Sequence, residues 1–368
     1  MDIADVTTPP TTYPSLAVRV RRAARWTTLG ALLAGVGGAT ALVAGLTGHG
    51  ATSSEAHPSI TPTMGLPYPL VAVLLGAAGL LVALGLVRLR ALVGAIGRAG
   101  TDRRGPAQTI TAVGAAGVAA LALAAVCDAN PLALTGYLPA MLVMAPFSEE
   151  MRLALASVPW PPMLAELAVV GTTAVVVLGA VTALDALRGD APRPRWQQPA
   201  AAARWGRTAV GVAVAAPLLY AVTRVAWVLG WPIGFDMASF EAAGGDVSNG
   251  LMLSAAAVVG SVLTIGLVRP WGERFWPWLP GLGGRRVPVP LAVVPASLVA
   301  AMLLPAGMSM IVGAVQGIGV AGLASLADNW AAVGVTFLWP VWSVALAAAT
   351  WAYALRRDGD RVAVTTAA

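Results

Sequence analysis

The stretch 164–186, LAELAVVGTTAVVVLGAVTALDA, is the clearest indication of the fold. It contains two charged residues, Glu166 and Asp185, and both lie near its ends. An α-helix rises about 1.5 Å per residue, so roughly 20 apolar residues cross the ~30 Å hydrocarbon core of a membrane. Backbone amides find no water in that core, and a continuous apolar stretch of this length must therefore be helical. The stretch predicts a transmembrane helix.

Seven further stretches have the same length and character. They are 27–47, 68–87, 109–127, 208–230, 250–268, 290–313 and 331–354. Across all eight stretches, the only charged residues are Glu166, Asp185 and Arg224. The first stretch follows a basic segment, but it is longer than the roughly 7–15 apolar residues of a secretory signal. We therefore expect an all-α fold, a polytopic bundle of eight transmembrane helices.

The composition of the chain agrees with a membrane location. Of 368 residues, 58% are hydrophobic and 11% are charged, whereas soluble domains carry about 25% charged residues. This excludes a soluble globular enzyme. The single cysteine, Cys127, excludes an internal disulfide.

The arginines predict how the helices are oriented. The segments 1–26, 88–108, 187–207, 269–289 and 355–368 hold 21 of the 23 basic residues, all of which are arginine. The alternate connections hold only Arg152. Cytoplasmic loops of membrane proteins are rich in arginine and lysine. We therefore expect both termini in the cytoplasm, with 1–26 a disordered basic segment, 355–368 a cytoplasmic tail, and the chain in a bacterial cytoplasmic membrane.

One external connection is itself apolar. Residues 131–147, PLALTGYLPAMLVMAPF, are too few to span comfortably and are interrupted by Pro139 and Pro146. If they spanned, every later loop would change sides and the arginine pattern would fail. An interfacial or re-entrant helix is expected, with 314–330 as a second segment of this kind.

The charges inside the predicted helices are the candidate site. Arg224 and Glu166 both lie a few residues inside the external ends of their stretches. A lone charge at such a depth costs several kcal/mol unless it is paired or hydrated. We hypothesise that Glu166 and Arg224 meet across adjacent helices, either as a structural pair or as a polar site for transport.

Motifs for catalysis and metal binding are absent from the sequence. The string SEEMR at 148–152 is similar to the paired glutamates of CAAX-type intramembrane proteases, but both histidines, His49 and His57, precede it. Nucleotide-binding loops, zinc-binding histidine pairs and nucleophile elbows do not occur. We predict no catalytic residue, no metal and no cofactor.

Two strings resemble an uncharacterised family of multi-pass membrane proteins from high-GC, actinobacterial-type bacteria. They are YAVTRVAWVLGWPIG at 220–234 and WGERFWPWLPGLGGRRVP at 271–288. The resemblance implies no activity, but it directs attention to Arg224, Trp227, Glu273, Arg285 and Arg286. We expect Arg285 and Arg286 to contact lipid headgroups after a glycine-rich turn, with positive-inside anchoring alone as the other interpretation.

Three functions remain open from the sequence. A non-catalytic membrane scaffold or accessory subunit fits the lack of catalytic groups. A transporter or permease fits the buried charges and the prolines within the helices. An enzyme acting on lipid-linked substrates is a third alternative. Membrane lipids and other membrane proteins are the expected partners, and nucleic acid is not.

Overall fold

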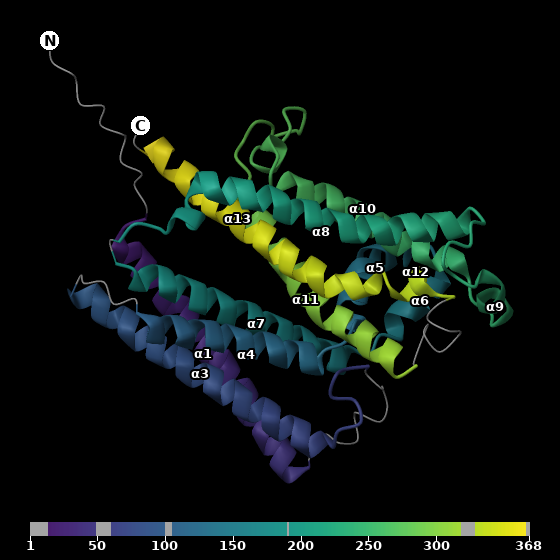
Figure 1. Cartoon of the computed structure of the whole chain (residues 1–368), viewed down its shortest axis with the longest axis horizontal. Coiled ribbons are helices and arrows are strands. Elements are labelled where there is room, and N and C mark those ends of the chain that lie inside the picture. Colours follow the sequence, from purple (N-terminus) through teal and green to yellow (C-terminus); the bar gives the residue numbers. More distant parts are fainter. Residues whose placement is uncertain (1–13, 49–59, 100–104, 190, 318–327, 366–368) are drawn as a thin grey trace.

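The computed structural model describes residues 14–48, 60–99, 105–189, 191–317 and 328–365, and these residues are almost entirely helical (Figure 1). The α-helices are α1 (Leu16–Thr47), α3 (Tyr68–Ala99), α4 (Pro106–Val126), α5 (Asn130–Met144), α6 (Glu149–Ala156), α7 (Trp160–Leu187), α8 (Pro199–Val228), α9 (Met237–Ala242), α10 (Gly250–Gly266), α11 (Val289–Val315), α12 (Trp330–Val333) and α13 (Trp339–Thr365). Short 3₁₀ turns lie at Arg195–Gln197, Val247–Asn249, Pro270–Gly272 and Thr336–Leu338. The predicted all-α class is confirmed.

Seven helices within the described residues are long and apolar enough to cross a membrane. They are α1, α3, α4, α7, α8, α11 and the run Trp330–Arg357 that contains α12 and α13. The eighth predicted span, 250–268, is the shorter helix α10. It ends at Gly266 because Leu267, Val268 and Arg269 continue as tight turns before Pro270.

The first and last helices extend beyond their predicted ends. The helix α1 begins at Leu16, so the prediction of a disordered segment over 1–26 is wrong from Leu16 onward. Arg19 donates hydrogen bonds to the carbonyl oxygens of Asp185 and Gly189, which fixes the start of α1 to the end of α7. Residues 1–13 lie outside the described residues. At the other end, α13 continues to Thr365 and includes most of the predicted tail.

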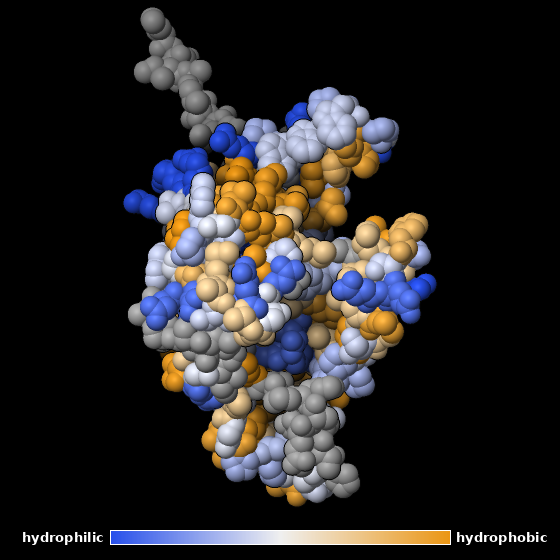
Figure 2. Space-filling view, turned by 90° about the vertical axis from the view of Figure 1, so that its right-hand side faces the viewer, coloured by the Kyte–Doolittle hydropathy of each residue, from blue (hydrophilic) through white to orange (hydrophobic). Residues whose placement is uncertain are grey.

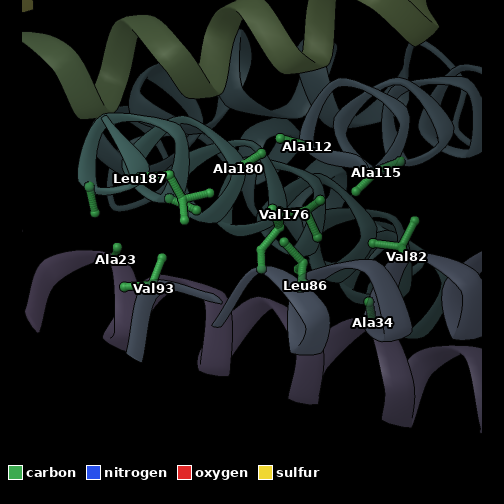
Figure 3. Packing of buried hydrophobic residues seen from close by; sticks show 14 of the residues in the cluster. Ala23, Ala34, Val82, Leu86, Val93, Ala112, Ala115, Val176, Ala180 and Leu187 are labelled. Carbon is green, nitrogen blue, oxygen red and sulfur yellow. The ribbon is translucent and has the colours of Figure 1, made fainter. Parts of the chain in front are cut away.

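The helices pack as two sets of four that follow the order of the chain. The first core contains side chains from α1, α3, α4 and α7, drawn in Figure 3. The second contains side chains from α8, α10, α11 and α13. The helix α11 also contacts α4 and α7, and Met302 of α11 packs with Cys127 and Val170 where the two sets meet.

Alanine and glycine allow the first set to pack closely. A Cβ added to Gly38 of α1 would lie 2.9 Å from the carbonyl oxygen of Gly76 in α3. One added to Gly76 would lie 2.6 Å from the backbone nitrogen of Leu42. The two backbones therefore touch, as small residues permit in membrane helices.

The outer surface of the bundle is apolar. Leucine and valine side chains such as Leu84, Leu121, Val222 and Leu263 are each more than 60% exposed. Figure 2 views the end of the molecule that carries α6, α9 and α12, and apolar residues gather on its flanks. Exposed apolar surface on this scale is typical of a protein that lies in lipid.

The structure describes one of the two predicted interfacial or re-entrant segments and only part of the other. Most of residues 131–147 lies in the 15-residue helix α5 (Asn130–Met144), which packs against α10 and α11 and is too short to span, as expected. Most of the second predicted segment lies outside the described residues. The last span is interrupted after it: α12 ends at Val333, a 3₁₀ turn follows, and α13 begins at Trp339.

Candidate functional site

Arg224 lies between two aromatic rings of its own helix. Its guanidinium carbon is 4.2 Å from the centroid of the Tyr220 ring and 4.3 Å from that of the Trp227 ring. Residues four before and three after Arg224 share its face of the helix. Contact with an aromatic face stabilises a partly desolvated cation by about 1–2 kcal/mol.

The guanidinium also donates hydrogen bonds to the interrupted last span. Its Nη1 contacts the carbonyl oxygen of Ala331 at 3.3 Å, and its Nη2 contacts that of Ala332 at 3.4 Å. Irregular backbone at membrane depth must find its hydrogen-bond partners inside the protein. Arg224 therefore joins α8 to the start of the last span. We call Arg224, Tyr220, Trp227, Ala331 and Ala332 the Arg224 site.

A small apolar cluster closes this site toward α9. The ring of Trp227 stacks on that of Phe235, with centroids 4.2 Å apart, and Trp227 Nε1 donates to the carbonyl oxygen of Ile233. The backbone nitrogen of Asp236 donates to the side-chain oxygen of Asn329, which is buried. The connection after α8 is thus fixed to the segment before α12, and Arg224 lies in a packed interface.

Acidification will loosen the connection that contains α9. Hydrogen bonds from Ser239 and Ser248 hold the pKa of Asp236 and of Asp246 below the ordinary value of 3.8. A lowered pKa in the folded state means that the stabilisation is present at neutral pH and is lost as the pH falls through that pKa. We expect the amides of Ser239 and Ser248 to lose protection from hydrogen exchange below about pH 4.

The Asp236→Asn variant is the control for this prediction. Asparagine also caps helices well but does not titrate. The exchange of Ser239 in the variant should therefore follow intrinsic chemistry alone as the pH falls. If the wild-type protein shows the same profile as the variant, the Asp236 carboxylate does not stabilise α9.

The structure does not bring Glu166 and Arg224 together. Glu166 lies near the start of α7, and its carboxylate accepts a hydrogen bond from the backbone nitrogen of Asp128 at 3.2 Å. Each of the two predicted site residues therefore has other partners than the hypothesis gave it.

Asp128 is a site residue that the sequence reasoning missed. It is 5% exposed, just beyond the end of α4, and its two carboxyl oxygens accept hydrogen bonds from the backbone nitrogen and the side-chain amide of Asn130. It precedes α5 and lies beside the contact of α4, α7 and α11. The sequence does show an acid directly after the apolar stretch 109–127. A single sequence does not show that this acid lies next to the start of α7 and Glu166.

The paired glutamates at 149–150 begin α6. Ser148 caps this helix by accepting a hydrogen bond from the backbone nitrogen of Met151. Acidic side chains in the first turn of a helix interact favourably with its dipole, which explains the string without catalysis. Within the described residues, no group of three or more histidine, cysteine or acidic side chains could hold a metal ion.

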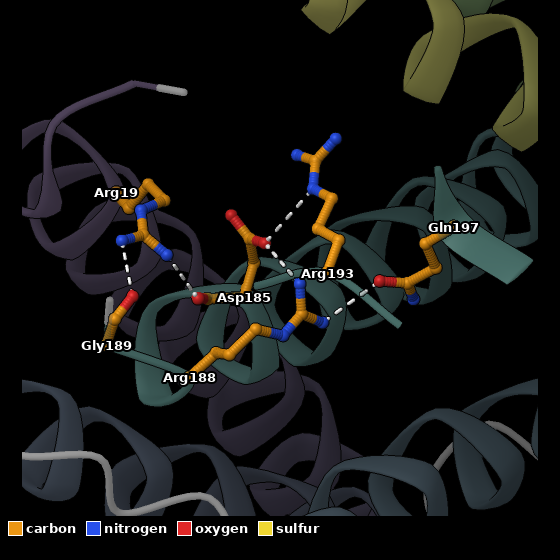
Figure 4. Close-up of polar contacts among 6 residues, drawn as sticks. All are labelled: Arg19, Asp185, Arg188, Gly189, Arg193 and Gln197. Carbon is orange, nitrogen blue, oxygen red and sulfur yellow. Dashed lines mark hydrogen bonds and ion pairs between the residues drawn. The ribbon is translucent and has the colours of Figure 1, made fainter. Parts of the chain in front are cut away.

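Arginines gather at the opposite ends of the helices. Figure 4 shows the Asp185 carboxylate near Arg188 and Arg193, at 3.5 and 3.9 Å. Arg188 is buried and also donates to Gln197. Asp185 therefore has arginine partners at the end of α7. Arg285 and Arg286 are exposed on the loop between α10 and α11.

Comparison of the chain with known protein families, with curated proteins and with solved structures finds no match.

Proposed function

We propose that the chain is an integral membrane protein with eight spans and both termini on the cytoplasmic side of a bacterial cell membrane. The count of eight includes α10, whose 17 residues rise about 25 Å. It begins where Gly250 lies against the side chain of Arg224. It ends beside Leu267, whose carbonyl oxygen accepts a hydrogen bond from Arg356 at the far end of α13. The helix α10 packs along α8 from the depth of Arg224 to that of Arg356. This extent supports the proposal that α10 crosses the membrane as α8 does.

The contacts between connections support the same orientation. Segments that the arginine pattern assigns to the cytoplasm contact one another, as Arg19 does with Gly189 and Arg356 with Glu273. Segments assigned to the outside also contact one another, as Asp236 does with Asn329. This grouping is what an even number of antiparallel crossings produces.

Within this topology we propose a non-catalytic scaffold or accessory subunit. The observation that supports it is the Arg224 site, because the intramembrane arginine is packed between aromatic rings and donates to backbone carbonyl oxygens. A transport site would instead present such a charge to an open path. Here the charge holds one span to another.

The alternative is a proton-linked transporter, and the Asp128–Glu166 pair favours it. The backbone nitrogen of Asp128 donates to the Glu166 carboxylate, so these two acidic residues are neighbours. Like charges held close together repel, and one bound proton would relieve the repulsion. The pair lies where the two four-helix sets meet, close to Met302 of α11. Movement of one set against the other would alter the access of water to that proton.

Proton flux into proteoliposomes distinguishes the two functions. Vesicles that contain the protein and a pH-sensitive dye are given a membrane potential with valinomycin. The scaffold predicts the same dye response for the wild-type protein and for the Asp128→Asn/Glu166→Gln variant. The transporter predicts a flux in the wild-type protein that the variant lacks.

The Glu149→Gln/Glu150→Gln variant is the matched control, because it removes two exposed acids from the same end of the molecule. A flux that depends on Asp128 and Glu166 but not on this second pair would contradict the scaffold. An amide oxygen can still accept the hydrogen bond that each of these side chains receives from a backbone nitrogen, so we expect the Asp128→Asn/Glu166→Gln variant to fold and elute as the wild-type protein does.

A further inference from the structure

The loop between α10 and α11 contains a short hairpin, Glu273–Val287, which we call the Trp–Arg hairpin. The backbone nitrogen of Phe275 donates to the carbonyl oxygen of Arg285, and that of Val287 donates to Glu273. Gly284, with φ +74°, helps to close the turn. In Figure 1 this green loop projects from the top of the bundle, across the direction of the helices and beside the end of α10.

The base of the hairpin is bound to α13. Arg357, which is buried, donates to the carbonyl oxygens of Glu273 and Val287. Arg356 forms an ion pair of 3.0 Å with the Glu273 carboxylate, which is the only acid in residues 269–289. The acid of this loop is therefore paired with Arg356 at the base of the hairpin, and the part of the loop that projects is basic.

Three exposed arginines belong to the projecting part. Arg274 and Arg286 form an antiparallel bridge pair that is not hydrogen-bonded to each other. In such a pair the side chains share one face, with Cβ atoms about 5 Å apart, and like charges directly opposite repel. Arg285 directly precedes Arg286 on the same strand.

Exposed aromatic side chains accompany the arginines. Trp276 is 46% exposed and Trp278 is 70% exposed, and their rings stack with centroids 5.5 Å apart. Leu282 at the turn is 42% exposed. Tryptophan is enriched at the level of lipid headgroups because its ring is apolar and its N–H is polar. Exposed tryptophan beside exposed arginine matches the chemistry of an anionic membrane surface.

We propose that the Trp–Arg hairpin binds the phosphate groups of anionic lipids in the cytoplasmic leaflet, with Trp276, Trp278 and Leu282 inserted among the headgroups. The proposal rests on the topology proposed above, which puts residues 269–289 on the cytoplasmic side. It names the partner of Arg285 and Arg286 and adds Arg274 to the surface. Each arginine near an anionic surface strengthens binding about five-fold.

A spin label at the turn tests the proposal. A nitroxide is attached to the Leu282→Cys variant in nanodiscs of phosphatidylcholine, with or without phosphatidylglycerol. The native Cys127 is buried, and the labelled parent chain measures its background. The ratio of oxygen to water-soluble nickel-chelate collisions then reports the depth of the label. We expect phosphatidylglycerol to move the label away from water.

Arginine and tryptophan variants identify the cause of such a shift. The Arg274→Gln/Arg285→Gln/Arg286→Gln variant should lose the effect of phosphatidylglycerol, by about five-fold in apparent affinity for each arginine. The Trp276→Ala/Trp278→Ala variant should leave the label shallower in both lipids. The control, Arg88→Gln/Arg90→Gln/Arg204→Gln, removes three exposed arginines outside the hairpin and should keep the shift.

Two results overturn the proposal. If the label is fully accessible to the nickel chelate in both lipids, the hairpin projects into water and does not contact lipid. Its exposed surface would then be available only to a soluble partner. If the control variant loses the shift as completely as the hairpin variant, the response belongs to the whole basic face.

A separate measurement distinguishes failure of the topology from failure of the lipid contact. A membrane-impermeant maleimide is applied to intact cells that express the Leu282→Cys variant. Labelling from outside would contradict the proposed topology whatever the depth of the nitroxide. Protection from outside, together with a water-exposed nitroxide, would contradict only the lipid contact.

Discussion

Replacing Arg224 with methionine will lower the free energy of unfolding by about 3 kcal/mol, because several interactions are lost together. Hydrogen bonds from a charged donor contribute about 1.5–3 kcal/mol each, and Arg224 donates to both Ala331 and Ala332. Contact with the two rings contributes about 1–2 kcal/mol more. Removing the charge from the membrane returns roughly 2–3 kcal/mol, so the loss is smaller than the sum.

Thermal unfolding in detergent measures this change, and two further variants identify its origin. The Arg207→Met variant removes an exposed arginine from the same helix, and its midpoint should stay near that of the wild-type protein. The Arg224→Lys variant keeps the charge but cannot donate to two carbonyl oxygens and stack on two rings, so it should recover part of the loss. Equal midpoints for Arg224→Met and Arg207→Met would contradict a structural role for Arg224.

Adding one methyl group to Gly38 will destabilise the first four-helix set, whereas adding one to Gly37 will not. The new Cβ at Gly38 would lie 2.9 Å from backbone atoms of α3, which cannot move aside without separating the two helices. Overpacking of this kind costs about 1–3 kcal/mol. At Gly37 an added Cβ has no neighbour within 4 Å, and alanine is favoured over glycine in a helix by roughly 0.5–1 kcal/mol.

The difference between the two alanine variants is therefore the quantity to measure. Gly37 and Gly38 are adjacent on one helix, so the two substitutions lie at nearly the same depth and in the same local sequence. Only the contact with α3 differs between them. We expect the unfolding midpoint of Gly38→Ala to fall well below that of Gly37→Ala. If the two midpoints coincide, α1 and α3 are farther apart in the membrane than their backbones lie here.

The sequence predicted the helices better than their ends. Apolar length identified the seven helices that are long enough to cross a membrane, because the cost of unpaired backbone in lipid leaves few alternatives. It missed the start of α1 at Leu16, since Arg19, Arg21 and Arg22 look like a soluble segment until Arg19 contacts the end of α7. The end of a span depends on such contacts between distant residues.

The candidate site was predicted less completely than the fold. Tyr220 and Trp227 lie four residues before and three after Arg224, so their contact with it could be read from helical spacing. The carbonyl oxygens of Ala331 and Ala332 could not, because they are exposed only where the last span is interrupted. The partner of Glu166 could not be identified for a similar reason. Apolar patterns do not specify which of two acids at neighbouring helix ends lies opposite.

The division of the bundle into two consecutive sets has a consequence for biogenesis. The first core is closed by the contact between α1 and α7, so all its helices have been synthesised once residue 189 leaves the ribosome. Chains grow at about 5–20 residues per second, which leaves roughly ten seconds or more before the last helix is complete. The first set can therefore assemble in the membrane during translation and present the ends of α4 and α7 as a ready surface for α11. The insertion machinery then needs to protect only the second set. In that set, Arg224 of α8 has no backbone partner until the interrupted last span has been synthesised.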